Sequence, residues 1–403
     1  MDYKIFGCKV NKYYLNKRLN HLENTDDKDF IIASCVVTDR AKNKFIKETI
    51  QQIEKWKHIY LTWCAVFDQW KKMDEEKFYN IYPQLSELKN QITLLWEEPN
   101  RDDTRKVWTH QFKKEANIYT KKFIVIQNWC DNYCSFCLTI HKRWKSKNIP
   151  AEEITQEINN FVEIWGKEIV LTWINLAARW CTDTKKPKNN KFAQLLQQIL
   201  DKTKIERIRI SSLWPEFLDD KFFEVVKNQR FLPHFHISIQ SFSDKILKSM
   251  NRNYDSKILD KIINKLKNLD RPDKKQISIW ADIIVWFPWE TEENFQETVN
   301  WIQKYQINKV HAFPFSAHDK WETIPAHWLP NQVPQEIKKR REKELKVISD
   351  KIREDFIKNN KWLKHKVLIE EKKDWKRKWR TWNYIQVELD WKYKKWEIVK
   401  IKL

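Results

Sequence analysis

The sequence predicts an α/β protein built from three parts: a layered α/β domain, a parallel barrel and a small antiparallel β-barrel. Over most of the chain, short apolar runs alternate with longer polar segments of helical character, which is the pattern of α/β folds. After residue 360 the pattern changes to short runs of alternating hydrophobicity separated by polar turns, as in small antiparallel barrels. A chain of 403 residues is long enough for several domains with separate cores.

Residues 1–115 form the first predicted domain, which we interpret as Rossmann-like. Its apolar runs cover residues 3–6, 29–37 and 58–62, and each is followed by a polar helical stretch. Each run ends at or near a cysteine, namely Cys8, Cys35 and Cys64. Because ligand sites in open α/β sheets lie at the carboxyl ends of strands, these thiols can converge. One such cysteine alone is usually a small buried hydrophobe, but three in equivalent places favour a metal cluster.

Residues 116–350 form the second predicted domain, a run of six β/α units typical of a parallel, partly open barrel of the TIM type. Its predicted strands cover residues 123–127, 168–172, 207–211, 234–240, 277–285 and 309–314. Sites in such barrels lie at the carboxyl ends of the strands. The loop after the first strand carries Cys130, Cys134 and Cys137 in the spacing Cys-x3-Cys-x2-Cys.

Three thiolates at these spacings can hold three irons of a [4Fe–4S] cluster and leave the fourth iron open to a small molecule. A structural zinc site normally needs four protein ligands, often as two Cys-x2-Cys pairs, and the sequence has no second pair. The alternatives are three unrelated cysteines, or a zinc site completed by a distant histidine such as His141. Cys181 belongs to no motif and is interpreted as an ordinary thiol.

A long, highly charged helix is predicted over residues 334–359, and the third domain follows over residues 360–403. Its predicted strands, residues 365–370, 384–390 and 397–402, favour a small antiparallel β-barrel. Between the first two strands lie basic residues that can meet RNA phosphates: Lys372, Lys373, Lys376, Arg377, Lys378 and Arg380. The alternative is a solvated basic hairpin without a ligand.

Charge and composition limit the class of protein and its partners. The formal net charge is +21, with lysine and arginine along the whole chain, which favours a polyanionic partner such as RNA. A lysine-rich proteome is the alternative source of this excess. No apolar run approaches the ~20 residues of a membrane helix, so we expect a soluble protein without a membrane partner. An odd number of cysteines and a polar start without a signal peptide predict a cytoplasmic location.

The glycine and tryptophan counts are abnormal. At the usual ~7%, a chain of this length would hold about 28 glycines, whereas this one has 2 Gly and 23 Trp. Several tryptophans stand where turns favour glycine, as in Asp374-Trp375 and Asp390-Trp391. We hypothesise that most of them are glycines, because the source organism reads UGA as glycine and the translation read it as tryptophan. Trp301, in a helix-like segment, is the best candidate for a true tryptophan; a Trp-rich protein that stacks nucleobases is the alternative.

The Cys-x3-Cys-x2-Cys motif resembles the signature of radical S-adenosylmethionine (radical SAM) enzymes. Three further segments resemble the cysteine motifs of the methylthiotransferases in that group: Phe-Gly-Cys-Lys-Val-Asn around Cys8, Ser-Cys-Val-Val-Thr around Cys35, and Thr-Trp-Cys ending at Cys64. Relatives have Gly in place of Trp63. The resemblance implies two [4Fe–4S] clusters, one on Cys130, Cys134 and Cys137 and an auxiliary one on Cys8, Cys35 and Cys64.

Later strand ends resemble the family segments that form the S-adenosylmethionine pocket, when Gly is read for Trp. They imply cofactor contacts from Trp173 and Asn175, and from Gln240 and Asp282 on later strands. Arg252, in Met-Asn-Arg, is a further candidate for binding the cofactor carboxylate. These polar groups could equally tie strand ends together. The chain departs from relatives at Phe242, where they have Gly after Gln-Ser.

The third domain resembles the TRAM domain, an RNA-binding appendage of tRNA-modifying enzymes. The motif around Cys8, together with His-Ala-Phe-Pro-Phe-Ser from His311 to Ser316, favours the branch that methylthiolates carbon 2 of N6-threonylcarbamoyladenosine beside the anticodon. In this family one cluster acts with S-adenosylmethionine, and the auxiliary cluster supplies the transferred sulfur. The implied partners of this expected monomer are the tRNA anticodon stem-loop, a flavodoxin- or ferredoxin-type electron donor and a sulfur source.

Three alternatives remain open. Two are enzymes of the same chemistry, one acting on a ribosomal protein and one on isopentenyladenosine in tRNA. The third is a non-catalytic, Trp-rich protein that binds zinc and RNA. Modified-nucleoside analysis separates the first two, and metal analysis identifies the third.

Overall fold

The computed structural model describes residues 2–6, 28–36, 38–68, 71–95, 120–128, 130, 132–142, 147–172, 191–318, 324–330, 334–370, 378–389 and 393–403. The chain forms two compact units. The first contains Met1–Ile118, Cys137–Lys145 and Ser316–His327, and the second contains Tyr119–Phe136, Ser146–Phe315 and Trp328–Leu403. Within the described ranges, no helix has both the length and the apolar content that crossing a membrane requires.

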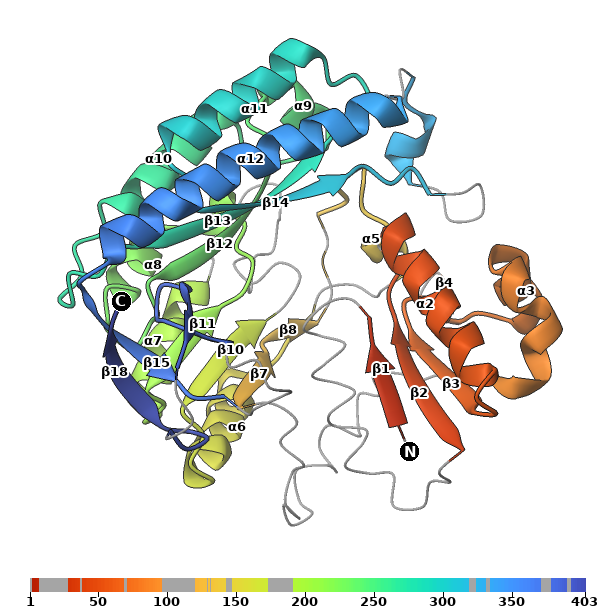
Figure 1. The fold of residues 1–403 in the computed structure, drawn as a ribbon, viewed down its shortest axis with the longest axis horizontal. Helices are drawn as coiled ribbons and strands as arrows, with labels where there is room; N and C mark the ends of the chain where they lie inside the picture. The colour runs from red at the N-terminus through yellow and green to blue at the C-terminus, as the bar shows by residue number, and fades with distance from the viewer. Residues whose placement is uncertain are drawn as a thin grey trace. The chain divides into compact units, whose positions relative to one another are not determined.

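A four-stranded parallel sheet in the order β1-β2-β3-β6 organises the first unit (Figure 1). The strands are β1 (Asp2–Ile5), β2 (Asp29–Ser34), β3 (His58–Trp63) and β6 (Ile92–Leu94). Helix α2 (Asp39–Ile53) begins at Thr38, whose hydroxyl accepts a hydrogen bond from the Ala41 N–H at 3.2 Å. The helix packs on β2 and β3 and buries Phe45. The other described elements of this part are β4 (Phe67–Asp68), β5 (Lys71–Lys72), α3 (Glu75–Ile81), η1 (Pro83–Gln91), α5 (Thr139–Lys142) and η4 (Pro325–Trp328).

Six parallel strands dominate the second unit, in two three-stranded sheets of order β7-β10-β11 and β12-β13-β14. They are β7 (Lys121–Val125), β10 (Glu168–Thr172), β11 (Arg207–Ile210), β12 (His234–Gln240), β13 (Ser278–Val285) and β14 (Lys309–Pro314). A parallel bridge between Leu213 and Ile237 connects the two sheets. All six predicted strands are therefore present, each within two residues of its expected bounds, and the predicted α/β class with parallel strands is confirmed.

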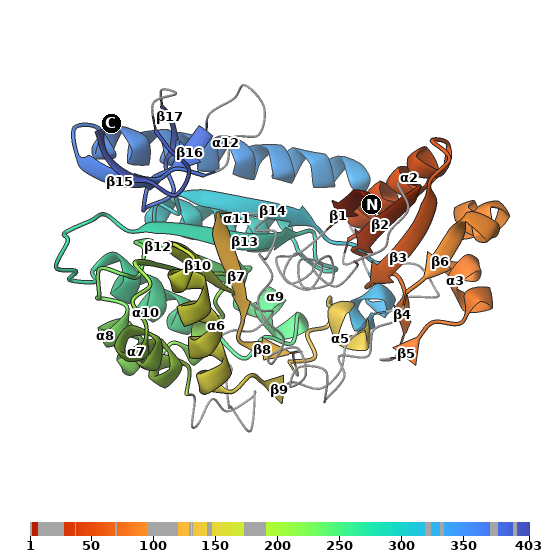
Figure 2. The same ribbon diagram turned by 90° about the horizontal axis from the view of Figure 1, so that it is seen from below.

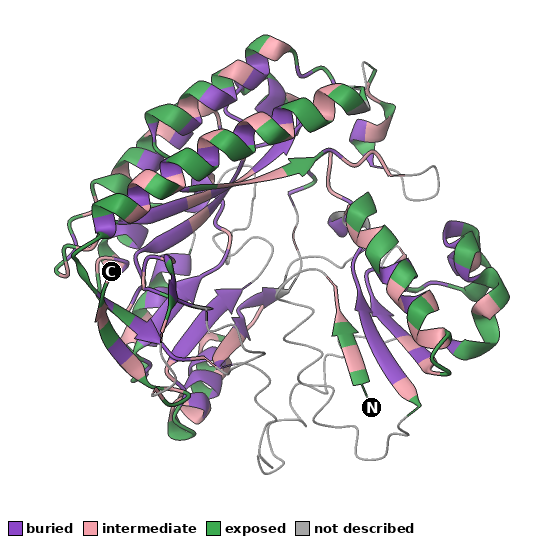
Figure 3. Cartoon of the chain, in the orientation of Figure 1, coloured by how far each residue is buried: buried purple, intermediate pink, exposed green. Residues whose placement is uncertain are grey.

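Helices cover the outer side of these strands. Beside β12–β14 lie α10 (Ser256–Lys267), α11 (Glu292–Lys304) and α12 (Gln335–Asn360) (Figure 1), and beside β7–β11 lie α6 (Ala151–Glu163), α7 (Phe192–Lys202) and α8 (Asp220–Val225) (Figure 2). Strands β10, β11, β12 and β13 are mostly buried, β7 and β14 are partly exposed, and the helices expose their outward sides (Figure 3). In α10 the buried residues Leu259, Ile262, Ile263 and Leu266 have helical spacing and form the inner side. Shorter elements are β8 (Gln127–Asn128), β9 (Lys147–Asn148), η3 (Pro215–Phe217) and α9 (Asp244–Ser249).

The carboxy-terminal strands form two antiparallel ribbons. One pairs β15 (Lys364–Leu368) with β18 (Ile398–Lys402), and the other pairs β16 (Lys378–Arg380) with β17 (Gln386–Glu388). A bridge between Val367 and Thr381 connects them. Their common core contains Val367, Ile369, Trp379, Val387 and Val399.

A buried ion cluster ties these ribbons to the amino-terminal ends of β10 and β11. Glu168 accepts hydrogen bonds from Arg207 Nε and Arg209 Nε, both at 2.7 Å, and Arg209 also donates to the Thr381 carbonyl oxygen at 3.3 Å. Burial raises the pKa of Glu168, but the nearby cations Arg209, Lys121 and Arg207 lower it by a larger amount, so that the pKa lies well below its usual range. The carboxylate is therefore charged, and the loss of one partner would leave a buried charge uncompensated.

Candidate functional site

The Cys-x3-Cys-x2-Cys loop follows the carboxyl end of β7. Cys134 is buried, and Cys130 and Cys137 are half-buried. The turn after α9 fastens the loop, because the side-chain amide of Asn251 donates to the Tyr133 carbonyl oxygen at 2.8 Å. Burial and this contact hold the Cys134 part of the loop in place, as a ligand-bearing loop requires.

Arg252, in the same turn, fixes the environment of Cys134. Its guanidinium donates to Cys134 Sγ at 3.4 Å, to the Tyr254 hydroxyl at 2.8 Å and to the Ser238 carbonyl oxygen at 2.8 Å. The guanidinium carbon lies 3.6 Å from the centroid of the Trp214 ring. Burial lowers the pKa of Arg252, but Tyr254 and Cys134 raise it by a larger amount. The net effect is a raised pKa, so Arg252 stays charged. A cation beside a cysteine favours the thiolate, which is the form that binds iron.

Among the residues that the structure describes, a complete ligand set is not assembled. Within the described ranges, no group of three or more His, Cys, Asp or Glu side chains is arranged to hold a metal ion. The metal-binding roles of Cys130, Cys134 and Cys137 therefore stay predictions. One sulfur atom does lie in surroundings that suit a metal ligand, since the buried Cys134 accepts a hydrogen bond from a charged guanidinium.

Two predicted cofactor contacts lie on strands of the second unit. Gln240 is the last residue of β12, is half-buried, and has a positive φ of 68° next to a register shift between β12 and β13. Asp282 lies in β13, and its Oδ1 is 2.8 Å from Nε2 of His236 on β12. Asp282 thus ties two neighbouring strands together. Contact of Asp282 and Gln240 with a cofactor stays a prediction.

Glu216 is a buried carboxyl that the sequence analysis missed. It lies in η3, two residues after Trp214, and neither of its carboxylate oxygens has a hydrogen-bond partner among the described residues. Burial raises the pKa of Glu216 to about 7, although Arg252 lowers it. Polar groups buried without partners are rare in folded proteins and require an explanation. Because burial here depends on tertiary packing, the tripeptide Pro-Glu-Phe carries no signal of it.

Two cysteines of the second predicted set lie at one edge of the sheet in the first unit. In the parallel register of β2 and β3, Ser34 lies opposite Trp63, so Cys35 and Cys64 follow adjacent strand ends. Both cysteines are buried. The Ser34 hydroxyl donates to the Thr62 carbonyl oxygen at 2.6 Å, which ties the two strand ends together.

Seven predicted site residues lie outside the described part of the chain: Cys8, Trp173, Asn175, Lys372, Lys373, Lys376 and Arg377. Lys378 begins β16, where its backbone alone is described. Arg380 ends the same strand and is exposed, with its guanidinium carbon 5.0 Å from the centroid of the Tyr384 ring. RNA contact from these basic residues stays a prediction.

Known proteins similar to this chain decide the family. The radical SAM superfamily model matches residues 124–302. The threonylcarbamoyladenosine tRNA methylthiotransferase MtaB of Rickettsia prowazekii is 31% identical over 405 residues, which cover 96% of this chain and 90% of that protein. MtaB of Thermotoga maritima is 31% identical over 392 residues, or 91% of this chain and 85% of that protein. The chain belongs to the methylthiotransferase family of radical SAM enzymes.

Other methylthiotransferases are similar over a shorter part of the chain. The tRNA-2-methylthio-N(6)-dimethylallyladenosine synthase of Campylobacter jejuni is 33% identical over 261 residues, which cover 64% of this chain and 59% of that protein. Among solved structures, the radical SAM methyltransferase TsrM of Kitasatospora setae has a TM-score of 0.47 and 10% identity, covering 76% of this chain and 67% of TsrM.

About half of the described tryptophans of this methylthiotransferase have a left-handed backbone conformation. Of the 13 tryptophans among the described residues, seven have φ between 60° and 74°: Trp56, Trp63, Trp165, Trp286, Trp289, Trp362 and Trp396. This region is an outlier for a bulky residue, whereas glycine adopts it freely. The family motifs have Gly where Trp63, Trp286 and Trp289 stand. These backbone angles support the hypothesis that such tryptophans stand for glycines.

The turn after β13, where this methylthiotransferase has Phe-Pro-Trp-Glu-Thr, is held by an ion pair that the sequence analysis also missed. Glu290 Oε2 accepts a hydrogen bond from the Trp286 N–H at 2.6 Å and pairs with Arg341 of α12 at 3.0 Å. Both charged side chains are buried. Burial raises the pKa of Glu290 to about 7, while the Trp286 N–H and Arg341 lower it. The pair joins residues 51 positions apart, so no local pattern indicates it.

Proposed function

We propose that this chain is a tRNA methylthiotransferase that adds a methylthio group to carbon 2 of N6-threonylcarbamoyladenosine beside the anticodon. The observation that carries the proposal is its similarity to MtaB proteins, at 31% identity over 90% and 85% of their lengths. The shorter similarity to the dimethylallyladenosine enzyme makes isopentenyladenosine in tRNA the second candidate substrate.

In this proposal Cys130, Cys134 and Cys137 hold the radical SAM [4Fe–4S] cluster. With S-adenosylmethionine, this cluster supplies the reductive cleavage that activates an unreactive C–H bond of the adenine ring. Arg252 supports the ligand role of Cys134, since its guanidinium lies 3.4 Å from the sulfur and favours the thiolate. The cofactor is expected to contact Trp173, Asn175, Gln240, Arg252 and Asp282.

The auxiliary cluster is assigned to Cys8, Cys35 and Cys64 and supplies the transferred sulfur. The support is that Cys35 and Cys64 follow adjacent parallel strands and are both buried. The bond between Ser34 and the Thr62 carbonyl oxygen holds these strand ends at a fixed spacing. A cluster bridging them would meet ligands that are already positioned.

The proposed domains follow the same assignment. Residues 1–115 form the Rossmann-like domain of the auxiliary cluster, residues 116–350 the radical SAM core, and residues 360–403 a TRAM-like RNA-binding domain. The net charge of +21 supports a tRNA substrate, bound through the anticodon stem-loop. We expect a cytoplasmic monomer served by a flavodoxin- or ferredoxin-type electron donor and a separate sulfur source.

The test is to express the chain in a bacterium that lacks its own tRNA methylthiotransferases and to analyse its tRNA nucleosides by mass spectrometry. We expect 2-methylthio-N6-threonylcarbamoyladenosine. Methylthiolated isopentenyladenosine would favour the second candidate, and a methylthiolated ribosomal protein with unmodified tRNA would contradict both. Purified protein that contains zinc and no acid-labile sulfide would identify the non-catalytic alternative.

A further inference from the structure

The two faces of the β12–β14 sheet differ in character. Alternate residues of a strand lie on opposite faces of a sheet. Ile237 and Ala281 are fully buried, as expected on the face that the outer helices cover. The opposite face, which is the inner face of the barrel, carries polar side chains at the middle of its strands. They are His236 of β12, Asp282 of β13 and His311 of β14, hereafter the inner polar group.

The members of the inner polar group lie against one another. Nε2 of His236 is 2.8 Å from Oδ1 of Asp282, and Asp282 stands opposite His311 in the register of β13 and β14. The His236 and His311 rings have centroids 5.2 Å apart. Because an ionised carboxylate only accepts hydrogen bonds, the proton of His236 belongs on Nε2, and Nδ1 of the neutral ring is an acceptor. Asp282 thus positions His236 and selects its tautomer, and Oδ2 of Asp282 can still serve the cofactor contact proposed above.

The inner polar group is accessible although it lies in the middle of barrel strands. The side chains of His236 and Asp282 are each 16% exposed, and His311 is half-buried. Phe313, two residues after His311 on the same face of β14, is 39% exposed. This exposure means that a ligand can reach the inner face. A few polar groups beside an aromatic ring are typical of sites for small planar ligands.

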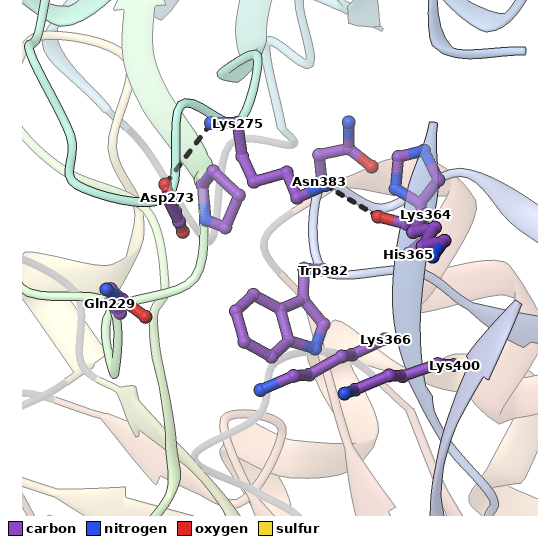
Figure 4. A pocket seen from close by; sticks show the side chains of 10 residues that line it. Gln229, Asp273, Lys275, Lys364, His365, Lys366, Trp382, Asn383 and Lys400 are labelled. Atoms are coloured by element: carbon purple, nitrogen blue, oxygen red, sulfur yellow. Dashed lines mark hydrogen bonds between the residues drawn. The ribbon is translucent and has the colours of Figure 1, made fainter. Parts of the chain in front are cut away.

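Aromatic rings close the amino-terminal end of the inner face. His234, the first residue of β12, stacks on Tyr384 with centroids 4.3 Å apart, and Trp280 packs edge-on against the same Tyr384 ring at 4.7 Å. Trp382, two residues before Tyr384, lines a cavity of about 220 Å³ at the amino-terminal ends of the strands (Figure 4). The rings separate this cavity from the inner polar group, which leaves the carboxyl ends of the strands as the way in for a ligand.

The inner polar group lies near the proposed chemistry. The Ser238 carbonyl oxygen accepts a hydrogen bond from Arg252 at 2.8 Å, and Ser238 follows His236 by two residues on β12. At ~3.3 Å per residue, His236 is about 7 Å from Ser238 and about 13 Å from Gln240 along the strand. A purine with a substituent on N6 can span such a distance. An adenine placed beside the cofactor can therefore direct its N6 substituent to the inner polar group.

We propose that the inner polar group binds the threonylcarbamoyl substituent of the target adenosine and selects it over an isopentenyl substituent. This inference rests on the proposed function and names the residues that choose between its two candidate substrates. The threonylcarbamoyl substituent offers a ureido group, a hydroxyl and a carboxylate to the imidazoles of His236 and His311. Lys309, two residues before His311, is exposed and adds a cation for the carboxylate, with its ammonium 5.7 Å from the Trp280 ring centroid.

An isopentenyl substituent makes no hydrogen bonds. In the same place it would remove water from His236 and Asp282 and give them no partner in return. Leaving buried polar groups without partners costs free energy, and a site built to hydrogen-bond its substrate rejects analogues that lack the bonding groups. The inner polar group therefore favours the polar substituent twice, by binding it and by excluding the apolar one.

The test uses two anticodon stem-loop RNAs of one sequence that differ only in the target nucleoside, N6-threonylcarbamoyladenosine or N6-isopentenyladenosine. His311→Phe keeps a ring and removes its nitrogens, and His236→Gln keeps an N–H for Asp282 but loses the Nδ1 acceptor. The control His58→Phe changes a half-buried histidine of β3 in the first unit, whose Nε2 lies 2.8 Å from the Thr93 hydroxyl. Equilibrium binding gives the affinity for each RNA, and methylthiolation by the cluster-loaded full chain gives the rates.

We expect each test variant to bind the threonylcarbamoyl RNA about tenfold more weakly and to lose its preference over the isopentenyl RNA by about the same factor. His311→Phe should release deoxyadenosine at the wild-type rate without RNA, and the control should match the wild type throughout. Unchanged affinity and preference in both test variants would overturn the inference. An equal loss for the two RNAs would also overturn it, because the group would then support the barrel without reading the substituent. A wild type that methylthiolates neither RNA, or only the isopentenyl one, would contradict the proposed function as well, which distinguishes the two failures.

Discussion

Arg252 connects the cysteine loop to the end of β12 through several directed bonds. Lysine keeps the charge but cannot reproduce the planar fork of donors. We expect Arg252→Lys to lower the free energy of unfolding by about 2 kcal/mol, because the Ser238 carbonyl oxygen and the Tyr254 hydroxyl lose charged hydrogen bonds. Denaturant titration measures this difference. The control Arg340→Lys, where an exposed guanidinium pairs with Glu292 at 2.6 Å, should cost less than ~1 kcal/mol; equal losses would contradict a special role for Arg252.

Glu216 should make stability depend on pH. Burial raises its pKa from 4.5 to about 7, so between these values the folded state binds more protons than the unfolded state. The stability that the neutral carboxyl provides is fully present below pH 4.5 and is lost as the pH rises through 7. At ~1.4 kcal/mol per pKa unit, the loss amounts to roughly 3 kcal/mol.

The variant Glu216→Gln cannot ionise and so tests this prediction. From about pH 5 to about pH 8, the unfolding free energy of the variant relative to the wild type should rise by roughly 3 kcal/mol. Glu224→Gln, an exposed control on α8, should show no such trend. A difference that stays constant with pH would mean that Glu216 titrates as an ordinary carboxyl.

At the scale of single elements, substitution can test the hypothesis that tryptophans with left-handed backbone stand for glycines. The best position is one where the indole is exposed. Trp56, in the turn after α2, is 88% exposed and has a φ of 60°. We expect Trp56→Gly to raise the free energy of unfolding by about 1 kcal/mol, because glycine adopts this backbone without strain. In contrast, Trp301→Gly in α11 should lower it by about 3 kcal/mol, since the Trp301 ring stacks on Phe242 with centroids 5.1 Å apart. Thermal melts measure both.

The gene distinguishes the same two classes of tryptophan directly. UGA codons at Trp63, Trp286 and Trp289, with UGG at Trp301, would establish that the turns around the proposed cofactor are glycine turns. UGG at all four positions would end the glycine hypothesis. A Trp56→Gly variant that is less stable than the wild type would contradict the glycine hypothesis independently of the gene sequence.

The elements themselves were predictable because their signals are local. The expected bounds of β12 and β14 match those observed, and that of β7 is shifted by two residues. The placement of Cys35 and Cys64 at one sheet edge follows from the general position of sites in parallel sheets. The pairing of Glu290 with Arg341 and the burial of Glu216 were missed, because both depend on side chains brought together by tertiary packing.

At the scale of the whole molecule, the proposed reaction needs two cysteine sets that belong to different parts of the chain. Cys35 and Cys64 follow strands of the first unit, and Cys134 packs against Arg252 in the second. One set is assigned to cleavage of S-adenosylmethionine and the other to sulfur transfer. Because each step has its own product, substitutions in the two sets should have different effects.

The last prediction separates these two steps. Cys134→Ala should reduce both deoxyadenosine release and methylthiolated tRNA to background, since without its cluster the enzyme cannot start the reaction. Cys64→Ala should retain deoxyadenosine release and lose the methylthiolated nucleoside, because cleavage needs no donated sulfur. Cys181→Ala, which changes a thiol outside every motif, should keep both products. If Cys64→Ala still formed methylthiolated tRNA, the transferred sulfur would have to come from elsewhere, and the burial of Cys35 and Cys64 at one sheet edge would be a matter of packing alone.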